Sequence, residues 1–219
     1  MMMDEGDNNR VPIIGVARHR LAVDGQGVTT LVAFHGCTLR CRYCLNAQCL
    51  RTNGFSRTIT PPELLDEVMI DNLYFLATGG GITFGGGEPA IRSEFIDAFY
   101  HMAPSEWHIT METALNVDRH HLERLLPLVH QYIIDIKDIN PDIYRRYTGQ
   151  DNRRALDNLR WLLDHEDMAE CIVVRVPHIP DYNTDDDVNC TREYLGELGI
   201  THIDEFTYKR SNPQTTQSI

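Results

Sequence analysis

Three cysteines, Cys37, Cys41 and Cys44, lie within eight residues at the spacing C-x3-C-x2-C. They directly follow the apolar run 31–34, so they fall on a loop at the carboxyl end of a predicted strand, where α/β folds collect ligand-binding residues. Thiolates are soft ligands that suit iron–sulfur clusters, zinc or copper. A structural zinc site usually closes with four protein ligands, whereas a cubane cluster held by three thiolates keeps one iron open. The loop predicts a metal centre that contacts a substrate, with iron–sulfur favoured over zinc.

Two other interpretations of the cysteines stay open from spacing alone. The three thiols could form a zinc site that His35 or Cys49 completes, or they could have no shared role. Disulfides are not expected, because no secretory signal is recognisable and the composition fits a reducing cytoplasm. Of the remaining cysteines, Cys49 is expected to be a bystander, and Cys171 and Cys190 are expected to be small buried hydrophobic residues rather than ligands.

A second candidate site is the segment Gly79–Pro89, which contains a short predicted strand, Ile82–Phe84, between two glycine triplets. Glycine clusters let a backbone approach a ligand closely and expose its amide donors. Glu88 would project from this loop at the carboxyl end of the strand. The alternative is a flexible turn whose carboxylate is solvated.

Polar residues also stand at the ends of two further predicted strands. Glu112 and Thr113 follow one strand, and Asp135 and Lys137 end the next. The interiors of parallel strands are continuously apolar, so charges at their ends usually face the mouth of the barrel. We therefore expect these side chains near a ligand, although Asp135 and Lys137 could also form a simple ion pair at the rim.

The elements that must position these residues alternate regularly along the chain. Strands are predicted over 28–35, 82–84, 107–111, 132–136, 171–176 and 202–206, and helices over 93–101, 118–126, 141–147, 155–165 and 185–198. Such alternation predicts parallel βαβ units with right-handed crossovers. About six strands are too few for a closed TIM barrel. The fold class is therefore α/β, a partial (β/α)6 TIM-like barrel in a single domain.

A further helix is predicted to begin at Thr60, because Thr60 and Glu63 have capping-box spacing and prolines suit a first turn. Its apolar stripe, Leu64, Leu65, Val68 and Met69, is expected to face the core. Residues 1–10 are predicted to be disordered, 11–208 to form the core domain, and 209–219 to be a polar C-terminal tail. Asp24–Gly27 is a turn, either of a simple hairpin or near an active site.

Composition limits the classes of partner. The chain has 219 residues, 42% of them hydrophobic and 24% charged, which is ordinary for a globular domain with a sizeable core. A net charge of −12 disfavours nucleic acid and anionic membranes as partners. No apolar stretch approaches the roughly 20 residues that span a bilayer. We expect a cytoplasmic protein that binds neither nucleic acid nor membrane.

The cysteine spacing, with the aromatic Tyr43 before the third cysteine, resembles the signature of the radical S-adenosylmethionine (SAM) superfamily. Further matches recur in the same order in its glycyl-radical-enzyme activating enzymes, and most of all in the type that activates pyruvate formate-lyase. These matches are Val23–Gly27, Cys44–Asn46, Gly85–Pro89, Asp135–Lys137 and Tyr147–Gly149. The likeness runs from about residue 11 to residue 208, most of the chain.

The resemblance implies a ligand set. Cys37, Cys41 and Cys44 would each ligate one iron of a 4Fe–4S cluster, and the fourth iron would take the amino and carboxylate groups of SAM. The same resemblance assigns SAM or a monovalent cation to residues at the strand ends, namely Gly86, Gly87, Glu88, Glu112, Thr113, Asp135, Lys137 and Arg175. Two positions depart from the family: Glu112 stands where it has aspartate, and Lys209 where it has a SAM-contacting histidine.

The activity that the resemblance implies is reductive cleavage of SAM to a 5′-deoxyadenosyl radical, which installs a glycyl radical on a partner enzyme. The implied partners are that glycyl radical enzyme and a flavodoxin- or ferredoxin-type electron donor. Two alternatives are a radical SAM enzyme that acts on a peptide or small molecule, and a non-enzymatic metal-binding module. A fourth cysteine at C-x2-C spacing would favour the module, and the sequence has none.

Overall fold

The structure is a computed structural model that describes residues 9–21 and 23–208. Its strands are β1 (Val11–Leu21), β2 (Val28–Phe34), β3 (Arg57–Ile59), β4 (Gly81–Gly86), β5 (His108–Thr113), β6 (Gln131–Asp135), β7 (Ile172–His178) and β8 (Ile203–Thr207). Its α-helices are α1 (Pro61–Val68), α2 (Asn72–Thr78), α3 (Ser93–Tyr100), α4 (Arg119–Leu125), α5 (Pro141–Thr148), α6 (Arg153–Leu163) and α7 (Asp185–Glu197). Short 3₁₀ helices are η2 (Ala47–Leu50), η3 (Met69–Asp71), η4 (Pro89–Arg92) and η5 (Met168–Cys171).

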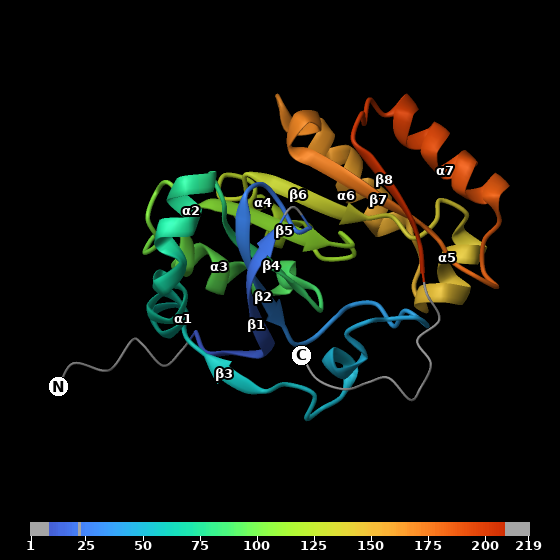
Figure 1. Cartoon of the computed structure of the whole chain (residues 1–219). Coiled ribbons are helices and arrows are strands. Elements are labelled where there is room, and N and C mark those ends of the chain that lie inside the picture. Colours follow the sequence, from blue (N-terminus) through green and yellow to red (C-terminus); the bar gives the residue numbers. More distant parts are fainter. Residues whose placement is uncertain (1–8, 22, 209–219) are drawn as a thin grey trace.

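All strands form one sheet in the order β3-β1-β2-β4-β5-β6-β7-β8. The pairs from β2 through β4, β5, β6 and β7 to β8 are parallel, whereas β1 is antiparallel to both β2 and β3. Within the described ranges β2 does not pair with β8, so the barrel stays open. Figure 1 shows α1, α2 and α3 beside the first parallel strands and α5, α6 and α7 beside the last. The predicted partial (β/α)6 barrel is confirmed.

The six predicted strands occur with ends shifted by one or two residues. Sequence reasoning missed β1 and β3. Pro12, Gly15 and a charged second half interrupt the apolar pattern of β1, and β3 is only three residues long. Both strands lie at the sheet edge beyond β2, where backbone pairing needs less apolar burial.

Helix α1 begins as predicted. Thr60 Oγ1 accepts a hydrogen bond from the Glu63 amide, and the Glu63 carboxylate accepts one from the Thr60 amide, which completes the capping box. Leu64 and Val68 are buried in the core. The expectation that Met69 belongs to the same buried stripe is wrong: Met69 lies on η3, where the tighter 3₁₀ winding rotates its side chain outward, and it is 39% exposed.

The turn between β1 and β2 closes a hairpin and contacts the interior of the sheet. Asp24 is buried, and its backbone oxygen accepts a hydrogen bond from the Thr83 hydroxyl on β4. Gly25 has a φ of +127°, and a Cβ there would lie 2.7 Å from Thr110 Oγ1. The turn is therefore a hairpin that packs closely against β4 and β5, and any larger residue in place of Gly25 would be strained.

Asp71 connects η3 to the hairpin and gives the first testable prediction. Its carboxylate is fully buried; it accepts hydrogen bonds from the Arg18 guanidinium and, at 2.8 Å, from Thr30 Oγ1. The Arg18 hydrogen bond holds the pKa of Asp71 below its ordinary value despite burial. We expect Asp71→Asn to lower the free energy of unfolding at pH 7 by about 2 kcal/mol, because a buried charge pair is broken.

Urea unfolding of wild type and Asp71→Asn measures this, with the exposed Asp66→Asn as control. A lowered folded-state pKa stabilises the protein above the ordinary aspartate value of about 3.9. That contribution disappears as pH falls through the folded pKa, so the two unfolding midpoints should converge in acid. Equal midpoints at pH 7 would show that Asp71 contributes nothing.

The predicted disordered segment 1–10 and tail 209–219 lie largely outside the described residues. Asn9 and Arg10 are described: the Asn9 amide donates to the Glu94 carbonyl, and Arg10 pairs with Glu63 at 2.9 Å. No helix in the described part of the chain is long and apolar enough to cross a membrane.

Candidate metal centre

The register of the parallel strands brings the candidate residues to one edge of the sheet. Phe34 on β2 pairs with Gly86 on β4, so the cysteine loop and the glycine loop leave the sheet side by side. Asp135 on β6 pairs with Arg175 on β7 in the same way. Because all these strands point in one direction, the residues that follow them collect at the carboxyl edge, as the sequence predicts.

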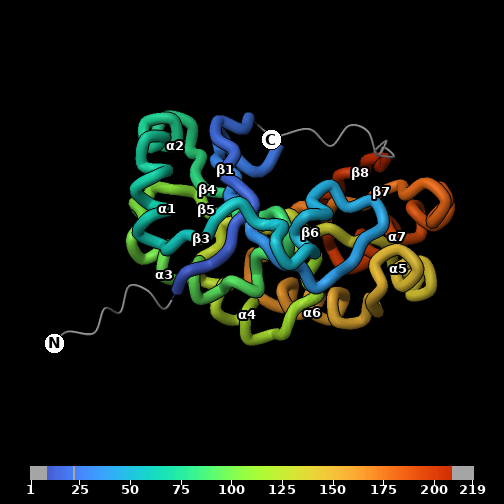
Figure 2. Tube along the Cα trace, turned by 90° about the horizontal axis from the view of Figure 1, so that it is seen from below, coloured from blue at the N-terminus to red at the C-terminus, as the bar shows by residue number. Residues whose placement is uncertain are grey.

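The cysteine loop is held from two sides. On one side, the Gly87 amide donates to Phe34 O at 2.9 Å and the Glu88 amide to Gly36 O at 2.8 Å. On the other side, the amides of Arg40 and Arg42 donate to carbonyls at the end of α5, at 2.8 and 3.1 Å. Figures 1 and 2 show this loop running from β2 toward α5. The backbone of the loop is therefore fixed without using its thiols.

Two glycines are required where the loops touch. A Cβ on Gly87 would lie 2.0 Å from Gly36 O, and one on Gly86 would lie 2.7 Å from the Cα of Ala33. Gly86 also has a φ of +89°, which side chains with a Cβ rarely adopt. The Asn46 side-chain amide donates to Gly86 O at 3.0 Å. The glycine loop therefore packs directly against the segment that carries the cysteines.

The three thiols are free and partly buried. Hydrogen bonding with Cys49 lowers the pKa of Cys37, and it lowers the pKa of Cys44 to about 6. Burial raises the pKa of Cys41 to about 12, although the nearby Lys137 acts in the opposite direction. Cys44 therefore already favours the thiolate form that ligates a metal, the pKa of Cys37 is shifted in the same direction, and a bound metal ion would stabilise all three thiolates.

Cys49 is a neighbour that sequence reasoning dismissed as a bystander. It lies on η2, is 2% exposed, and hydrogen-bonds with both Cys37 and Cys44, which raises its own pKa. The backbone bond from the Gly36 amide to Cys49 O at 3.2 Å brings η2 against the loop. No spacing rule could place a residue that reaches the loop by folding back on it.

We expect Cys49→Ala to retain the metal centre, because Cys49 keeps its proton and acts as a donor to two ligand thiolates. Iron and acid-labile sulfide content after anaerobic reconstitution should match wild type within about twofold, since neighbouring residues tune a metal site more weakly than its ligands do. Loss of metal in this variant would instead favour a zinc site closed by Cys49. His35 Nε2 donates to Arg51 O at 2.8 Å, so only Nδ1 of that ring could ligate such a zinc ion.

Glu88 lies inside the protein. It is 1% exposed, and its carboxylate accepts hydrogen bonds from Thr113 Oγ1 at 2.7 Å, the Ala114 amide at 3.0 Å and the Ala90 amide at 3.2 Å. Burial raises its pKa, and these three donors oppose the shift. Glu88 and Thr113 therefore join the glycine loop to the end of β5, and their polar groups are already occupied.

A network of charged side chains, called the charged network below, spans the ends of β5, β6 and β7. Arg175 donates from Nη1 to Glu112 and from Nε to Asp135, at 2.8 and 2.7 Å. Lys137 Nζ donates to the second oxygen of Asp135 and to the Tyr208 hydroxyl, both at 2.9 Å. Lys137 is 5% exposed. The predicted Asp135–Lys137 ion pair at the rim is present, as part of a larger network.

The pKa shifts in this network follow from its pairing. Burial alone would raise the pKa of Asp135, but Lys137 and Arg175 hold it below its ordinary value. Burial alone would lower the pKa of Lys137, but Asp135 raises it well above its ordinary value. Burial raises the pKa of Glu112, although Arg175 opposes this. Asp135 is therefore the charge on which both buried cations depend.

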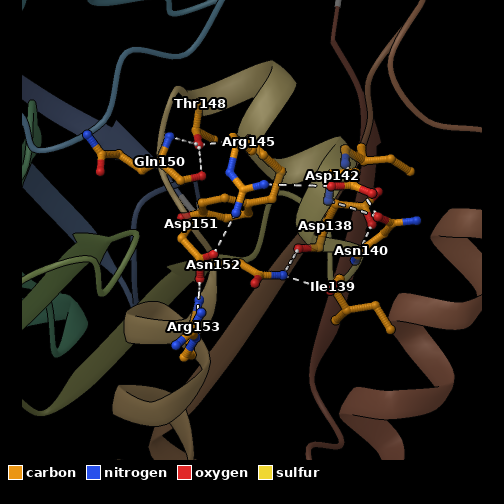
Figure 3. Close-up of polar contacts among 12 residues, drawn as sticks. Asp138, Ile139, Asn140, Asp142, Arg145, Thr148, Gln150, Asp151, Asn152 and Arg153 are labelled. Atoms are coloured by element: carbon orange, nitrogen blue, oxygen red, sulfur yellow. Dashed lines mark hydrogen bonds and ion pairs between the residues drawn. The ribbon is translucent and has the colours of Figure 1, made fainter.

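Three buried asparagines support the loops behind the site, and sequence reasoning missed them. Asn158 donates to the carbonyls of Leu115 and Val117, and Asn152 to those of Asp138 and Ile139. Asn183 donates to Pro177 O and Asp138 Oδ2. Figure 3 shows the Asn152 contacts and the neighbouring pairs of Asp151 with Arg145 and Arg153. Each asparagine reaches back to a loop that precedes it by several residues or more, so no local motif marks it.

A cavity of about 570 Å³ lies beside these supports, lined by residues of the β5–α4 loop and the start of α6 such as Val117, Asp151 and Arg153. None of its lining residues belongs to the cysteine loop or to the charged network. Within the described ranges, no three His, Cys, Asp or Glu side chains converge on a position for a single metal ion. A cubane differs from such a site because each thiolate ligates a different iron.

The residues present fit a cluster by their chemistry. The donor set is three thiols, a soft set that suits iron–sulfur. Their loop also carries a buried hydroxyl, Thr38 Oγ1, and the helix that binds the loop carries another, that of Tyr144; within the described structure neither hydroxyl has a hydrogen-bond partner. Buried polar groups are normally paired. Orphaned hydroxyls beside free thiols indicate that a polar group normally occupies this space.

Comparison with known proteins places these features in a family. The model of the radical SAM superfamily matches residues 31–190. The chain is 31% identical to the pyruvate formate-lyase-activating enzyme of Staphylococcus aureus over 184 residues, which covers 80% of this chain and 72% of that protein.

Solved structures share the fold at low identity. SuiB of Streptococcus suis bound to SAM superposes with a TM-score of 0.62 and 12% identity, over 86% of this chain and 44% of SuiB. The protein anSMEcpe with bound AdoMet gives a TM-score of 0.58 at 16% identity, over 84% of this chain and 51% of that chain. This chain thus spans about half or less of those structures, and the likeness shows the fold alone.

Proposed function

Because the chain belongs to the radical SAM superfamily, and within it groups with pyruvate formate-lyase-activating enzymes, we propose that it installs a glycyl radical on a partner enzyme. Members of this superfamily use a 4Fe–4S cluster and SAM, and the chain is a radical SAM enzyme of the activating type. The observation that carries the proposal is the meeting of the cysteine loop, the glycine loop and the charged network at one edge of the sheet.

Cys37, Cys41 and Cys44 would hold the cluster, each on one iron, and leave one iron for SAM. When bound, the reduced cluster would donate one electron to SAM and so cleave its sulfonium to methionine and a 5′-deoxyadenosyl radical. The chain's own part is to hold the thiolates on a rigid loop, to place SAM and to exclude water. The backbone bonds to Gly36 and to the end of α5 give that rigidity.

On the SAM side, we assign contacts to the backbone of Gly86 and Gly87 and to the network of Asp135, Lys137 and Arg175. The Arg175 guanidinium uses Nε and Nη1 for its two carboxylate partners, which leaves Nη2 to meet the SAM carboxylate. Glu88 supports this part of the site from inside, through Thr113 and the Ala114 amide. We give it the role of fixing the glycine loop.

A monovalent cation at Glu112 and Thr113 would need oxygens that already have partners. Arg175 pairs with the Glu112 carboxylate, and the Thr113 hydroxyl donates to Glu88 and accepts from the Leu115 amide. The Arg175 guanidinium already supplies a positive charge to the Glu112 carboxylate, at Oε1. We therefore propose the activity without a cation, with Arg175 in its place. The family histidine is Lys209 here, which lies outside the described residues.

The proposed glycyl step transfers one hydrogen atom from the glycine to the 5′-deoxyadenosyl radical. The α-C–H bond of the glycine breaks, a C–H bond forms in 5′-deoxyadenosine, and the unpaired electron stays on the glycine carbon. A glycine suits this step because it has no side chain and can enter a cleft as an extended loop. The reducing electron would come from a flavodoxin- or ferredoxin-type donor, for which dithionite can substitute in vitro.

The test combines anaerobically reconstituted protein, dithionite, SAM and pyruvate formate-lyase, and follows the glycyl radical by electron paramagnetic resonance (EPR). We expect the radical signal and 5′-deoxyadenosine in similar amounts, and neither with the Cys41→Ala protein. 5′-Deoxyadenosine without a radical on the partner would redirect the activity to a peptide or small molecule. If a cluster-loaded protein gave neither the radical nor 5′-deoxyadenosine, the remaining function would be that of a metal-binding module.

A further inference from the structure

Tyr144 is a buried residue beside the cysteine loop that the proposed mechanism does not yet use. It lies on α5, is 1% exposed, and its hydroxyl has no hydrogen-bond partner within the described structure. An unpartnered buried hydroxyl is costly, because it loses its bonds to water and gains nothing in return. Such a group in a native fold indicates a partner that the protein chain itself does not supply.

The position of the hydroxyl identifies that partner. Helix α5 holds the cysteine loop through Thr148 O and Tyr147 O, one turn after Tyr144. Burial raises the pKa of the Tyr144 hydroxyl, and the charged group that acts on it most strongly is the Cys41 thiol. Lys137, Glu88 and Cys37 act on it as well. Cys41 lies between the two loop residues, Arg40 and Arg42, that bond to the end of α5, and Tyr144 lies one turn earlier on the same helix, so its buried hydroxyl belongs to the contact between this helix and the cysteine loop.

The three thiols differ in the hydrogen bonds that they accept, and within the described ranges Cys41 is the one that lacks a donor. The Leu39 amide donates to Cys37 Sγ at 3.5 Å, and the Asn46 backbone amide donates to Cys44. Among the described residues no donor reaches the Cys41 sulfur. One thiol without a donor and one buried hydroxyl without an acceptor thus belong to the same contact between α5 and the cysteine loop.

We propose that the Tyr144 hydroxyl donates a hydrogen bond to the Cys41 thiolate, or to a sulfide on the iron it ligates, when the cluster is bound. Reduction adds negative charge to the sulfurs, so a donor stabilises the reduced cluster more than the oxidised one and raises its reduction potential. Tyr144 is a positioning and tuning residue in this account. The inference rests on the proposed cluster site, but not on glycyl radical installation.

The test uses Tyr144→Phe, which keeps the ring and removes only the hydroxyl. The matched control is Tyr132→Phe on β6, because Tyr132 is also fully buried with an unpartnered hydroxyl, while its charged neighbour is Cys171 instead of a cluster ligand. Both reconstituted proteins are titrated with redox dyes, and the reduced cluster is followed by EPR. In Tyr144→Phe we expect the ratio of reduced to oxidised cluster at a fixed potential to fall about tenfold, a midpoint shift of about 59 mV.

Stability without the cluster gives a second, independent readout. In the metal-free protein the hydroxyl has no partner, so Tyr144→Phe should melt at the wild-type temperature or slightly above it. A lower melting temperature would show that a protein group already pairs with the hydroxyl, and it would contradict the proposal.

Each of the remaining outcomes also decides whether the Tyr144 proposal holds. An unchanged midpoint with matched iron and sulfide content would overturn the proposal, as would an equal shift in Tyr132→Phe. A folded Tyr144→Phe protein that loads no cluster would contradict it too, because three cysteine ligands should suffice for loading. If wild type itself loads no cluster, the proposed function fails first, and that result is distinguishable from all of these.

Discussion

Cys41→Ala is expected to lose SAM cleavage completely, a fall on the order of 10⁶-fold or more to the uncatalysed rate. In the proposed site Cys41 supplies one of only three thiolates, so its loss would leave a second iron without a protein ligand. Iron and labile sulfide should fall well below the content of about four each that a cubane requires. Anaerobic reconstitution, metal analysis and chromatography of 5′-deoxyadenosine measure both effects.

The controls separate loss of a ligand from loss of the fold. The expectation that Cys190 is buried is wrong, because it lies on the outer face of α7 while Val188, Thr191 and Leu195 face inward. This exposed thiol should tolerate alanine with full iron content and full activity. The metal-free Cys41→Ala protein should melt close to the metal-free wild type, because the substitution removes one sulfur from a loop held by backbone bonds. Full SAM cleavage in a folded Cys41→Ala protein would remove Cys41 from the ligand set.

Asp135→Asn is expected to be the most destabilising single change at the strand ends. Its carboxylate pairs with both Arg175 and Lys137, so the amide would leave Lys137 without a charged partner and Arg175 with Glu112 alone. Breaking a buried pair in this way costs about 3–5 kcal/mol, which for a protein of this size lowers the melting temperature by roughly 10 °C. SAM binding should weaken as well, because Arg175 and Lys137 lose their positions.

Thermal unfolding of the metal-free proteins measures the cost, and Asp142→Asn is the matched control. Asp142 has an 87% exposed side chain and a 3.7 Å contact to Arg145, so its replacement should change nothing measurable. A melting temperature for Asp135→Asn equal to that of wild type would show that the network contributes no stability.

The pH dependence of this effect has a defined sign. The folded-state pKa of Asp135 is lowered, so its contribution is present above the ordinary aspartate value of about 3.9 and disappears as pH falls through the folded value. The folded-state pKa of Lys137 is raised, so its contribution is lost only as pH rises past the ordinary lysine range. The difference between wild type and Asp135→Asn should therefore persist from about pH 4 to pH 10 and shrink in acid.

The six parallel strands and most helices were predictable because their signals are local. Apolar runs mark strands buried on both faces, and Thr60 with Glu63 marks the start of α1. Strand β1 was not predictable in the same way, because Pro12, Gly15 and its charges break the pattern while antiparallel pairing to β2 stabilises it. Helix α2 ends at Gly79, which the sequence presented only as part of a glycine triplet.

The sequence named the candidate site residues but did not predict the contacts among them. Spacing identified the three cysteines, strand ends identified Glu112 and Asp135, and only the family resemblance added Arg175. That Arg175 bridges the other two could not follow from spacing, because the partners are 63 and 40 residues away. The same holds for Cys49 and Tyr144, which reach the cysteine loop only through the packing of η2 and α5.

The most direct test of the proposed function follows the hydrogen atom that the partner loses. Pyruvate formate-lyase is prepared with glycine deuterated at the α-carbon and activated anaerobically by this protein, and the 5′-deoxyadenosine is analysed by mass spectrometry. The proposal predicts that 5′-deoxyadenosine gains one mass unit of deuterium as the glycyl radical forms on the partner. Unlabelled 5′-deoxyadenosine, formed at the same rate with or without the partner, would contradict it.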